Sequence, residues 1–214
     1  MGREDWYRNT EWSPETRGAF WARLHRSRSE FSKAQYLRIQ ASCLEGAGLA
    51  EEALELLEYM FDHHPEKSEL ASALLSRATA LVRLGRDREA VEAFRASLEA
   101  ERGYPNARTE AALSFGEFAV LRDLAELYEE VEVELNAFVA SLPVLFPLQR
   151  FKILAIGAVV EHHQGNRSKA EELATNALRV ASQDQSGLRY HPKLGLVGAR
   201  QYGLLEKLGQ LSAS

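Results

Sequence analysis

Six histidines and one cysteine are the residues of this 214-residue chain best suited to metal binding or nucleophilic catalysis. Four of the histidines form two adjacent pairs, His63–His64 and His162–His163. Neighbouring residues on a helix point about 100° apart, so neither pair can readily hold one metal ion. Cys43 falls where a small, packed residue is expected rather than a nucleophile. These residues therefore predict no metal site and no catalytic thiol.

His191 is the remaining polar candidate, in the stretch RYHPK with Arg189 and Lys193. A turn histidine packed on the last helix is the commoner role, and we interpret it so. The sequence holds no nucleophile elbow, phosphate-binding glycine loop, dinucleotide fingerprint or zinc-protease motif. We therefore expect a non-catalytic protein without a cofactor.

The composition limits the class of protein further. The chain is 45% hydrophobic and carries a net charge of −5, which argues against general nucleic-acid binding. One cysteine cannot form an internal disulfide, and the first residues carry charges where a signal peptide needs an apolar core. The most apolar stretch, FVASLPVLFPLQRFKILAIGAVV, is broken by prolines and charges, so no membrane span is expected. We expect a soluble cytoplasmic protein.

One residue pattern occurs twice, 37 residues apart, in GLAEEALELLEYMFDHHP and GRDREAVEAFRASLEA. Each copy starts with glycine, at Gly48 and Gly85, and carries alanine five residues later, at Ala53 and Ala90. Another alanine precedes each of these by twelve residues, and a large apolar residue follows four positions later. Repetition of this kind predicts similar helix pairs that stack in series.

Two further copies extend the pattern. One keeps the offsets at Ala158, Gly165 and Ala170, and the other fits loosely, with Ala119, Val131, Leu135 and Pro143. The predicted repeat units are 34–67, 71–104, 112–145 and 151–184.

This pattern resembles the tetratricopeptide repeat (TPR) family over about 150 residues. The resemblance implies an all-α, right-handed superhelix of about four helix pairs with additional terminal helices. Small residues let the two helices of a pair approach, and glycine permits the turn between them. The flanks DWYRNTEW and LRYHPKLGLVG resemble a group of bacterial TPR-like proteins of unassigned function. That likeness favours a single domain over 1–214.

Helix-capping signals predict elements outside and within the repeats. Ser13–Pro14 predicts a helix at about 14–27, within the N-terminal segment 1–30. SKAQ (32–35) predicts a capping box before the first repeat helix, and Pro147 and Asn166 are expected to open the two helices of the last unit. Residues 185–214 are predicted to form a loop and a closing helix at about 194–210. No stretch alternates as a strand would.

The resemblance also implies a binding groove, because the first helix of each TPR pair lines the concave face. The groove positions along the four units are Gln35, Arg38, Ser42 and Glu45; Ser72, Leu75, Thr79, Val82 and Arg83; Leu113, Val120 and Asp123; and Lys152, Val159, His162 and His163. The polar positions expected to contact a protein or peptide are Gln35, Arg38, Ser42, Ser72, Thr79, Arg83, Lys152 and His162. For any single one of them, a merely solvated position is the favoured interpretation.

Charge is distributed unevenly along the chain. Residues 16–38 hold six bases and one acid, whereas residues 117–134 hold seven acids and one base. Four of these acids are spaced by three and four residues, so one helix would gather them into an acidic stripe of Asp123, Glu126, Glu130 and Glu134. Such a stripe could bind a basic partner, although a solvated outer face is favoured.

The aromatic residues of WYRNTEW, Trp6, Tyr7 and Trp12, are expected to pin the N-terminal segment onto the first helices. A partner-binding aromatic patch is the less favoured alternative.

Two functions follow as hypotheses. The first is a non-catalytic TPR-type module that binds a protein or peptide on its concave face. The second is an immunity or inhibitor protein that neutralises a bacterial toxin through acidic and groove surfaces. The ends of a repeat stack also permit a homodimer.

Overall fold

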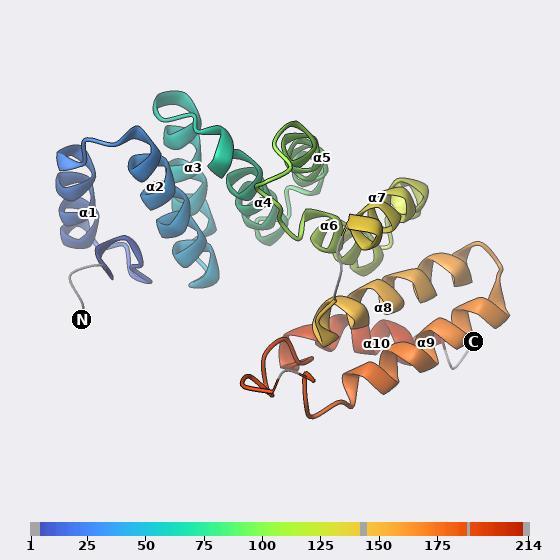
Figure 1. Cartoon of the computed structure of the whole chain (residues 1–214). Coiled ribbons are helices and arrows are strands. Elements are labelled where there is room, and N and C mark those ends of the chain that lie inside the picture. Colours follow the sequence, from blue (N-terminus) through green and yellow to red (C-terminus); the bar gives the residue numbers. More distant parts are fainter. Residues whose placement is uncertain (1–4, 142–144, 188, 212–214) are drawn as a thin grey trace. The chain divides into compact units, whose positions relative to one another are not determined.

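The computed structural model describes residues 5–141, 145–187 and 189–211, and these residues form α-helices, short 3₁₀ helices and loops without a strand (Figure 1). The all-helical prediction is thereby confirmed. The α-helices are α1 (Pro14–Arg26), α2 (Glu30–Gly46), α3 (Ala50–His63), α4 (Lys67–Arg83), α5 (Asp87–Gly103), α6 (Ala111–Leu121), α7 (Tyr128–Ser141), α8 (Pro147–His163), α9 (Arg167–Ala181) and α10 (Tyr202–Leu211). The 3₁₀ helices are η1 (Asp5–Tyr7), η2 (Ala125–Leu127) and η3 (Ala199–Gln201). No helix within the described ranges has both the length and the apolar character needed to cross a membrane.

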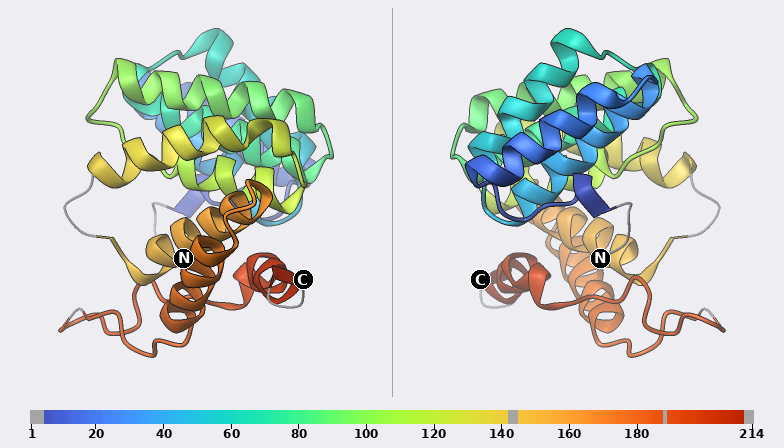
Figure 2. Two further views of the ribbon diagram at one scale, coloured as in Figure 1. Left: turned by 90° about the vertical axis from the view of Figure 1, so that its right-hand side faces the viewer. Right: turned by 90° about the vertical axis from the view of Figure 1, so that its left-hand side faces the viewer.

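The chain divides into two compact units, Met1–Ala111 and Ala112–Ser214. In the first unit α2 packs on α3 and α4 packs on α5, and α4 also contacts α2 and α3. In the second unit α8 and α9 form an antiparallel hairpin, which α10 contacts (Figures 1 and 2). Helices adjacent in sequence thus pack in pairs, as the repeat predicts. The single domain expected over the whole chain stays a prediction.

The glycines of the repeat form the turns between paired helices. Gly48, Gly85 and Gly165 have φ values of +88°, +70° and +83°, a conformation that costs glycine little. In each turn the next residue donates its backbone N–H to a carbonyl five residues back, which closes the helix end. The donor–acceptor pairs are Leu49–Leu44 at 2.9 Å, Arg86–Leu81 at 3.0 Å and Asn166–Glu161 at 2.9 Å.

A fourth turn of the same kind lies at Asp123, which has φ +54°. The N–H of Leu124 donates to the carbonyl of Ala119 at 3.0 Å, matching the other three turns. This position is three residues earlier than the loose third repeat predicts. The helix η2 fills those three residues, so the register of the second helix still follows the prediction.

The shifted register changes which small residue lies where α6 meets its neighbours. Ala41, Ala78 and Ala158 each precede the turn residue by seven positions, and all are buried. Seven positions before Asp123 is Gly116, not the expected Ala119. A Cβ atom added to Gly116 would lie 3.1 Å from side chains on both α7 and α8. Gly116 is therefore the residue at which α6 approaches α7 and α8 closely. Pro143, expected to end this unit, lies outside the described residues.

Helix caps agree with the sequence in part. Ser13 caps α1, with the Thr16 N–H donating to Ser13 Oγ at 3.2 Å, and Pro147 opens α8. The predicted capping box at 32–35 is wrong, because α2 starts three residues earlier and Ser29 Oγ accepts the N–H of Ser32 at 3.2 Å. Asn166 is at the N-cap of α9, but its side chain donates to Glu161 at 2.8 Å instead of capping the helix.

The buried Glu161 links the end of α8 to the start of α9. Its carboxylate accepts a hydrogen bond from the Asn166 side chain and forms an ion pair with Lys169. The hydrogen bond from Lys169, followed by that from Asn166, lowers the pKa of Glu161. A carboxyl group with a lowered folded-state pKa stabilises the fold above its unfolded value of about 4.3, and this contribution fades as the pH falls through the folded value.

The variant Glu161→Gln is therefore expected to melt a few degrees below wild type at neutral pH. The difference between the two melting temperatures should shrink as the pH falls through the lowered pKa of Glu161, because wild type then loses the same charge. Thermal unfolding followed by circular dichroism across this range checks the prediction. A difference that stays constant with pH would contradict it.

The N-terminal segment is held against α2 by a buried amide. Gln40 is 0% exposed and its Oε1 accepts from the N–H of Asn9 at 3.0 Å and from Asn9 Nδ2 at 2.8 Å. Gln40 Nε2 donates to the carbonyl of Asn9 at 2.7 Å. The aromatic residues of the segment, Trp6, Tyr7 and Trp12, pack against the core around Phe20. Pinning of this segment by its aromatic residues is confirmed.

The C-terminal helix is shorter than predicted. It begins at Tyr202 instead of about 194, after a loop whose Gly195 carbonyl accepts the N–H of Leu148 at 2.7 Å. Leu204 and Leu208 are buried, and α10 contacts α8 and α9. The closing helix thus covers the last pair, as expected.

Candidate functional site

The first helices of the two pairs in the first unit, α2 and α4, carry most of the predicted groove residues. Gln35, Arg38 and Ser42 recur on α2 at intervals of three and four, which places them on one face of the helix. Ser72, Thr79 and Arg83 recur on α4 at intervals of seven and four, which also places them on one face. Since α2 and α4 contact each other, we call the surface formed by these six residues the α2–α4 face.

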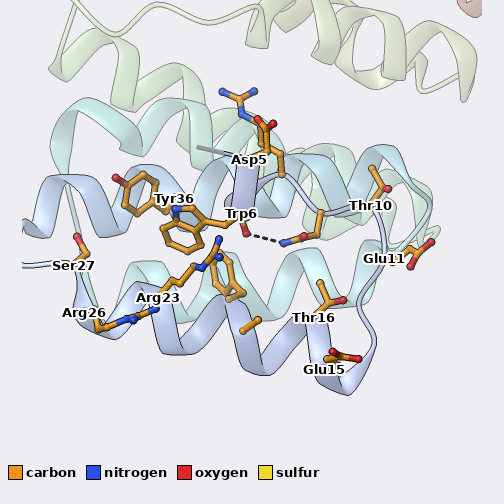
Figure 3. Close-up of a pocket in the computed structure, with 14 residues that line it drawn as sticks. Asp5, Trp6, Thr10, Glu11, Glu15, Thr16, Arg23, Arg26, Ser27 and Tyr36 are labelled. Carbon is orange, nitrogen blue, oxygen red and sulfur yellow. Dashed lines mark hydrogen bonds between the residues drawn. The ribbon is translucent and has the colours of Figure 1, made fainter. Parts of the chain in front are cut away.

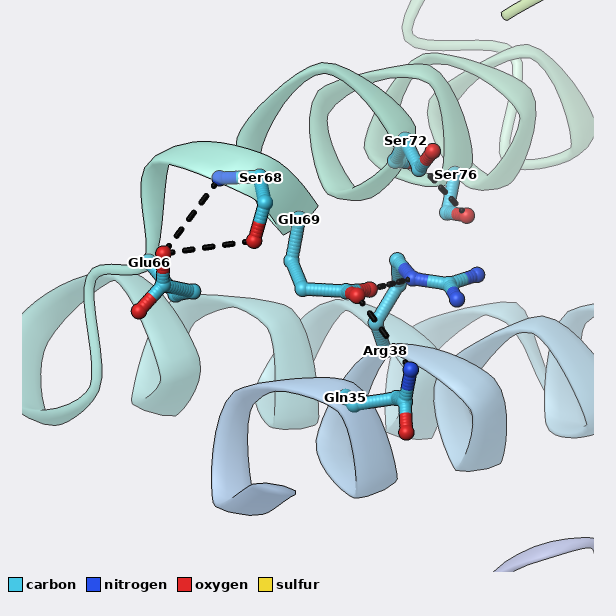
Figure 4. A network of polar contacts seen from close by, with 7 residues as sticks. All are labelled: Gln35, Arg38, Glu66, Ser68, Glu69, Ser72 and Ser76. Carbon is cyan, nitrogen blue, oxygen red and sulfur yellow. Dashed lines mark hydrogen bonds and ion pairs between the residues drawn. The ribbon is translucent and has the colours of Figure 1, made fainter. Parts of the chain in front are cut away.

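An ion pair at one end of this face joins the two helices. Arg38 Nε on α2 bonds to Glu69 Oε2 on α4, and Gln35 Nε2 donates to Glu69 Oε1 at 3.4 Å (Figure 4). Glu69 is only 7% exposed, so its carboxylate depends on these donors. Figure 4 shows the terminal nitrogens of Arg38 pointing away from Glu69. Arg38 therefore uses its Nε donor in this ion pair, and its terminal nitrogens lie outside it.

A second ion pair lies further along the same helices, with the base on α4 and the acid on α2. Arg83 Nε on α4 bonds to Glu45 on α2, and the Arg83 side chain stays 51% exposed. Glu45 was expected in the groove, but Glu69 was not. The sequence reveals Arg38 and Arg83 as bases, whereas the structure shows each one neutralised by the neighbouring helix. The α2–α4 face thus offers guanidinium donors without a net positive charge.

Hydroxyl groups line α4 between the two ion pairs. Ser76 Oγ donates to the Ser72 carbonyl at 3.0 Å, and Thr79 Oγ1 donates to the Ser76 carbonyl at 3.0 Å. A hydroxyl that donates within its own helix still has lone pairs that can accept. Ser42 is exposed on α2, and Leu75 is half-buried on α4. The surface therefore combines donors, acceptors and a small apolar area.

The predicted groove residues of the second unit have more varied positions. Lys152 on α8 forms an ion pair with Glu117 on α6 at 2.7 Å. This is a third ion pair between the first helices of successive pairs. His162 is half-buried near the end of α8.

Leu113 and Val120 are fully buried, so the prediction that they face a ligand is wrong. The sequence predicts Asp123 on a helix because its register is three residues off in this unit. In the structure Asp123 forms the turn after α6. Val159 is also buried, and His163 packs its ring 5.2 Å from that of Tyr128.

The acidic stripe is not one helical face. Asp123 lies in the turn and pairs with Lys207 at 2.5 Å, and Glu126 lies in η2. Only Glu130 and Glu134 share α7, where both are half-buried. The prediction of four carboxylates on one helix is wrong because the chain leaves α-helix at 122–127.

The cysteine and histidine side chains are considered next, since these residue types could serve in catalysis or metal binding. Cys43 is half-buried, and burial raises the pKa of its thiol, which lowers the reactive thiolate fraction. His63 stacks on Tyr59 at 4.2 Å, and His64 Nδ1 lies 2.5 Å from Glu30. The hydrogen bond from Lys33, and next that from His64, lowers the pKa of Glu30. His191 is exposed in its loop. In the part of the chain that the structure describes, no group of three or more His, Cys, Asp or Glu side chains could hold a metal ion.

The α2–α4 face is thus the place where the structure brings the predicted binding residues together. Comparison of the chain with protein-family models, with curated proteins and with solved structures finds no match.

Proposed function

We propose that the chain is a TPR-like helical repeat protein, a superhelix of about four helix pairs with additional helices at both ends. Four turns of one geometry, with a small residue seven positions before each, support this proposal. The contacts of α2 with α4 and of α3 with α4 are those that stacking of successive pairs requires.

We further propose that it is a non-catalytic interaction module, and that the α2–α4 face binds a segment of another protein. The observation that carries this proposal is the row of hydroxyls between two partly exposed arginines. An extended peptide presents backbone N–H and C=O groups alternately, which hydroxyl acceptors and guanidinium donors can satisfy. The internal ion pairs hold the arginines in place before the ligand arrives.

A random peptide library displayed on phage and selected on the full chain tests this function. Peptides that bind the α2–α4 face are expected to lose at least tenfold in affinity for Ser42→Arg and for Ser72→Arg, because each variant fills the surface with a long charged side chain. Glu92→Arg, on an exposed position of α5, is the matched control and should leave affinity unchanged. Thermal unfolding confirms that each variant is folded.

The proposal fails if no peptide is enriched. It also fails if every enriched peptide binds both α2–α4 variants as tightly as wild type.

The immunity or inhibitor function stays a hypothesis. The split of the acidic stripe among a turn, a 3₁₀ helix and α7 weakens its main structural motivation, because the four carboxylates do not lie along one helix.

A further inference from the structure

A separate pocket of about 1330 Å³ opens between the N-terminal segment and helices α1 and α2 (Figure 3). Trp6 and Tyr36 contribute aromatic rings, with centroids 4.8 Å apart. The pocket is larger than the roughly 300–1,000 Å³ typical of small-molecule sites. Its size favours a chain segment over a small metabolite.

Four of the six charged residues that line this pocket are separated by sign, and the other two, Asp5 and Arg8, carry opposite charges on the N-terminal segment. Figure 3 shows Arg23 and Arg26 at the end near Tyr36, and Glu11 and Glu15 at the opposite end. Arg23 and Arg26 lie three residues apart on α1 and so share one side of the helix. The pocket therefore has a basic end, an aromatic wall and an acidic end.

Several other charged residues of the first unit form ion pairs. Arg17 pairs with Glu55 at 3.4 Å, Lys33 with Glu30 at 2.8 Å, and Arg38 with Glu69. Within the described residues, by contrast, neither Arg23 nor Glu15 forms an ion pair. Among the residues that the structure describes, Arg26 bonds only to the Ala22 carbonyl of its own helix, at 3.1 Å. The pocket thus holds opposite charges too far apart to neutralise each other.

The separation along α1 defines what could satisfy both ends. Glu15 precedes Arg23 and Arg26 by eight and eleven residues, about 12–16 Å along the helix axis. An extended peptide advances about 3.3–3.6 Å per residue, so two of its residues four or five positions apart would span this distance.

We infer that this pocket binds an extended peptide segment carrying an acidic and a basic residue four to five positions apart, with an apolar side chain between them. The acidic side chain meets Arg23 and Arg26, the basic one meets Glu15 and Glu11, and the apolar one packs on Trp6 and Tyr36. This site is distinct from the α2–α4 face and does not depend on it.

A random hexapeptide library with capped ends, selected on the full chain, tests the inference. Enriched peptides are expected to carry both charges at that spacing and to quench the fluorescence of Trp6. The double variant Arg23→Glu, Arg26→Glu should weaken their binding at least tenfold. Arg28→Glu makes a similar change at an exposed arginine outside the pocket and should have no effect.

A charge exchange provides the sharpest test. The variant that combines Arg23→Glu and Arg26→Glu with Glu11→Arg and Glu15→Arg should favour peptides with the two charges in reversed order. Enrichment without the charge pair, absence of enrichment, or binding unaffected by the double variant would overturn the inference. Concentration-dependent dimerisation abolished by the double variant would also overturn it, since a second copy would then be the occupant.

The two proposed sites can fail separately. Peptides lost in Ser42→Arg but kept in the Arg23→Glu, Arg26→Glu variant belong to the α2–α4 face. The opposite pattern belongs to this pocket.

Discussion

Gln40→Ala is expected to destabilise the first unit by about 3 kcal/mol, the largest effect of any polar substitution considered. The side chain is fully buried and makes three hydrogen bonds to Asn9. Removing it leaves the Asn9 backbone without partners and opens a void under the N-terminal segment, so packing of Trp6 on Phe20 should loosen as well.

Tryptophan fluorescence during urea unfolding measures this effect, because Trp6, Trp12 and Trp21 all lie in the first unit. Gln35→Ala is a matched control on the same helix, since Gln35 makes one long hydrogen bond of 3.4 Å and should cost less than about 1 kcal/mol. Asn9→Ala completes a double-mutant cycle, in which Gln40 and Asn9 should not act additively. Equal losses for Gln40→Ala and Gln35→Ala would contradict this role of Gln40.

Gly116→Val is expected to destabilise the second unit by about 3 kcal/mol. A Cβ atom at this position would lie 3.1 Å from Ile156 Cδ1 and 3.1 Å from Val131 Cγ1, tighter than normal contacts. Two branched methyl groups would approach closer still, so α6 must move away from α7 and α8 or the side chains must leave their rotamers.

Urea unfolding followed by far-ultraviolet circular dichroism measures this loss, because the second unit has no tryptophan. Gly157→Ala is the matched control inside α8, where an added Cβ meets only Leu173 Cδ1 at 3.4 Å. That variant should stabilise by about 0.5–1 kcal/mol through the better helix propensity of alanine. A neutral Gly116→Val would show that α6 does not approach its neighbours closely.

The sequence predicts the helix pairs well where the signal is periodic. Ala53, Ala90 and Ala170 are all buried at the expected positions, and the turn glycines have positive φ. The signal is strong because only small residues fit a close helix crossing and only a few residue types tolerate left-handed backbone.

The turn of the third repeat lies three residues earlier than the sequence predicts, because the residues that mark this turn are less distinctive than glycine and alanine. Asp123 takes the left-handed conformation usually given to glycine, and aspartate does so often enough to form a turn without marking it. Gly116 serves as the small residue in place of alanine. Aligning on turn-compatible residues as well as glycines would have located both.

The candidate site was predicted only as a set of positions. Arg38 and Glu69 are 31 residues apart, and Arg83 and Glu45 are 38 apart, so their pairing depends on how α2 packs on α4. Helical spacing alone identifies which residues share a face but does not identify charge partners on the next helix. The pocket beside α1 was missed for the same reason, since it is formed by a loop and two helices.

Photo-crosslinking from the α2–α4 face tests the central claim most directly. Benzoylphenylalanine is incorporated at Ser72 or, separately, at the control position Glu92 in the full chain, and each protein is irradiated with a biotinylated library-selected peptide. Peptide binding by the α2–α4 face predicts crosslinks from position 72 and none from position 92. Crosslinks from position 92 alone would contradict it.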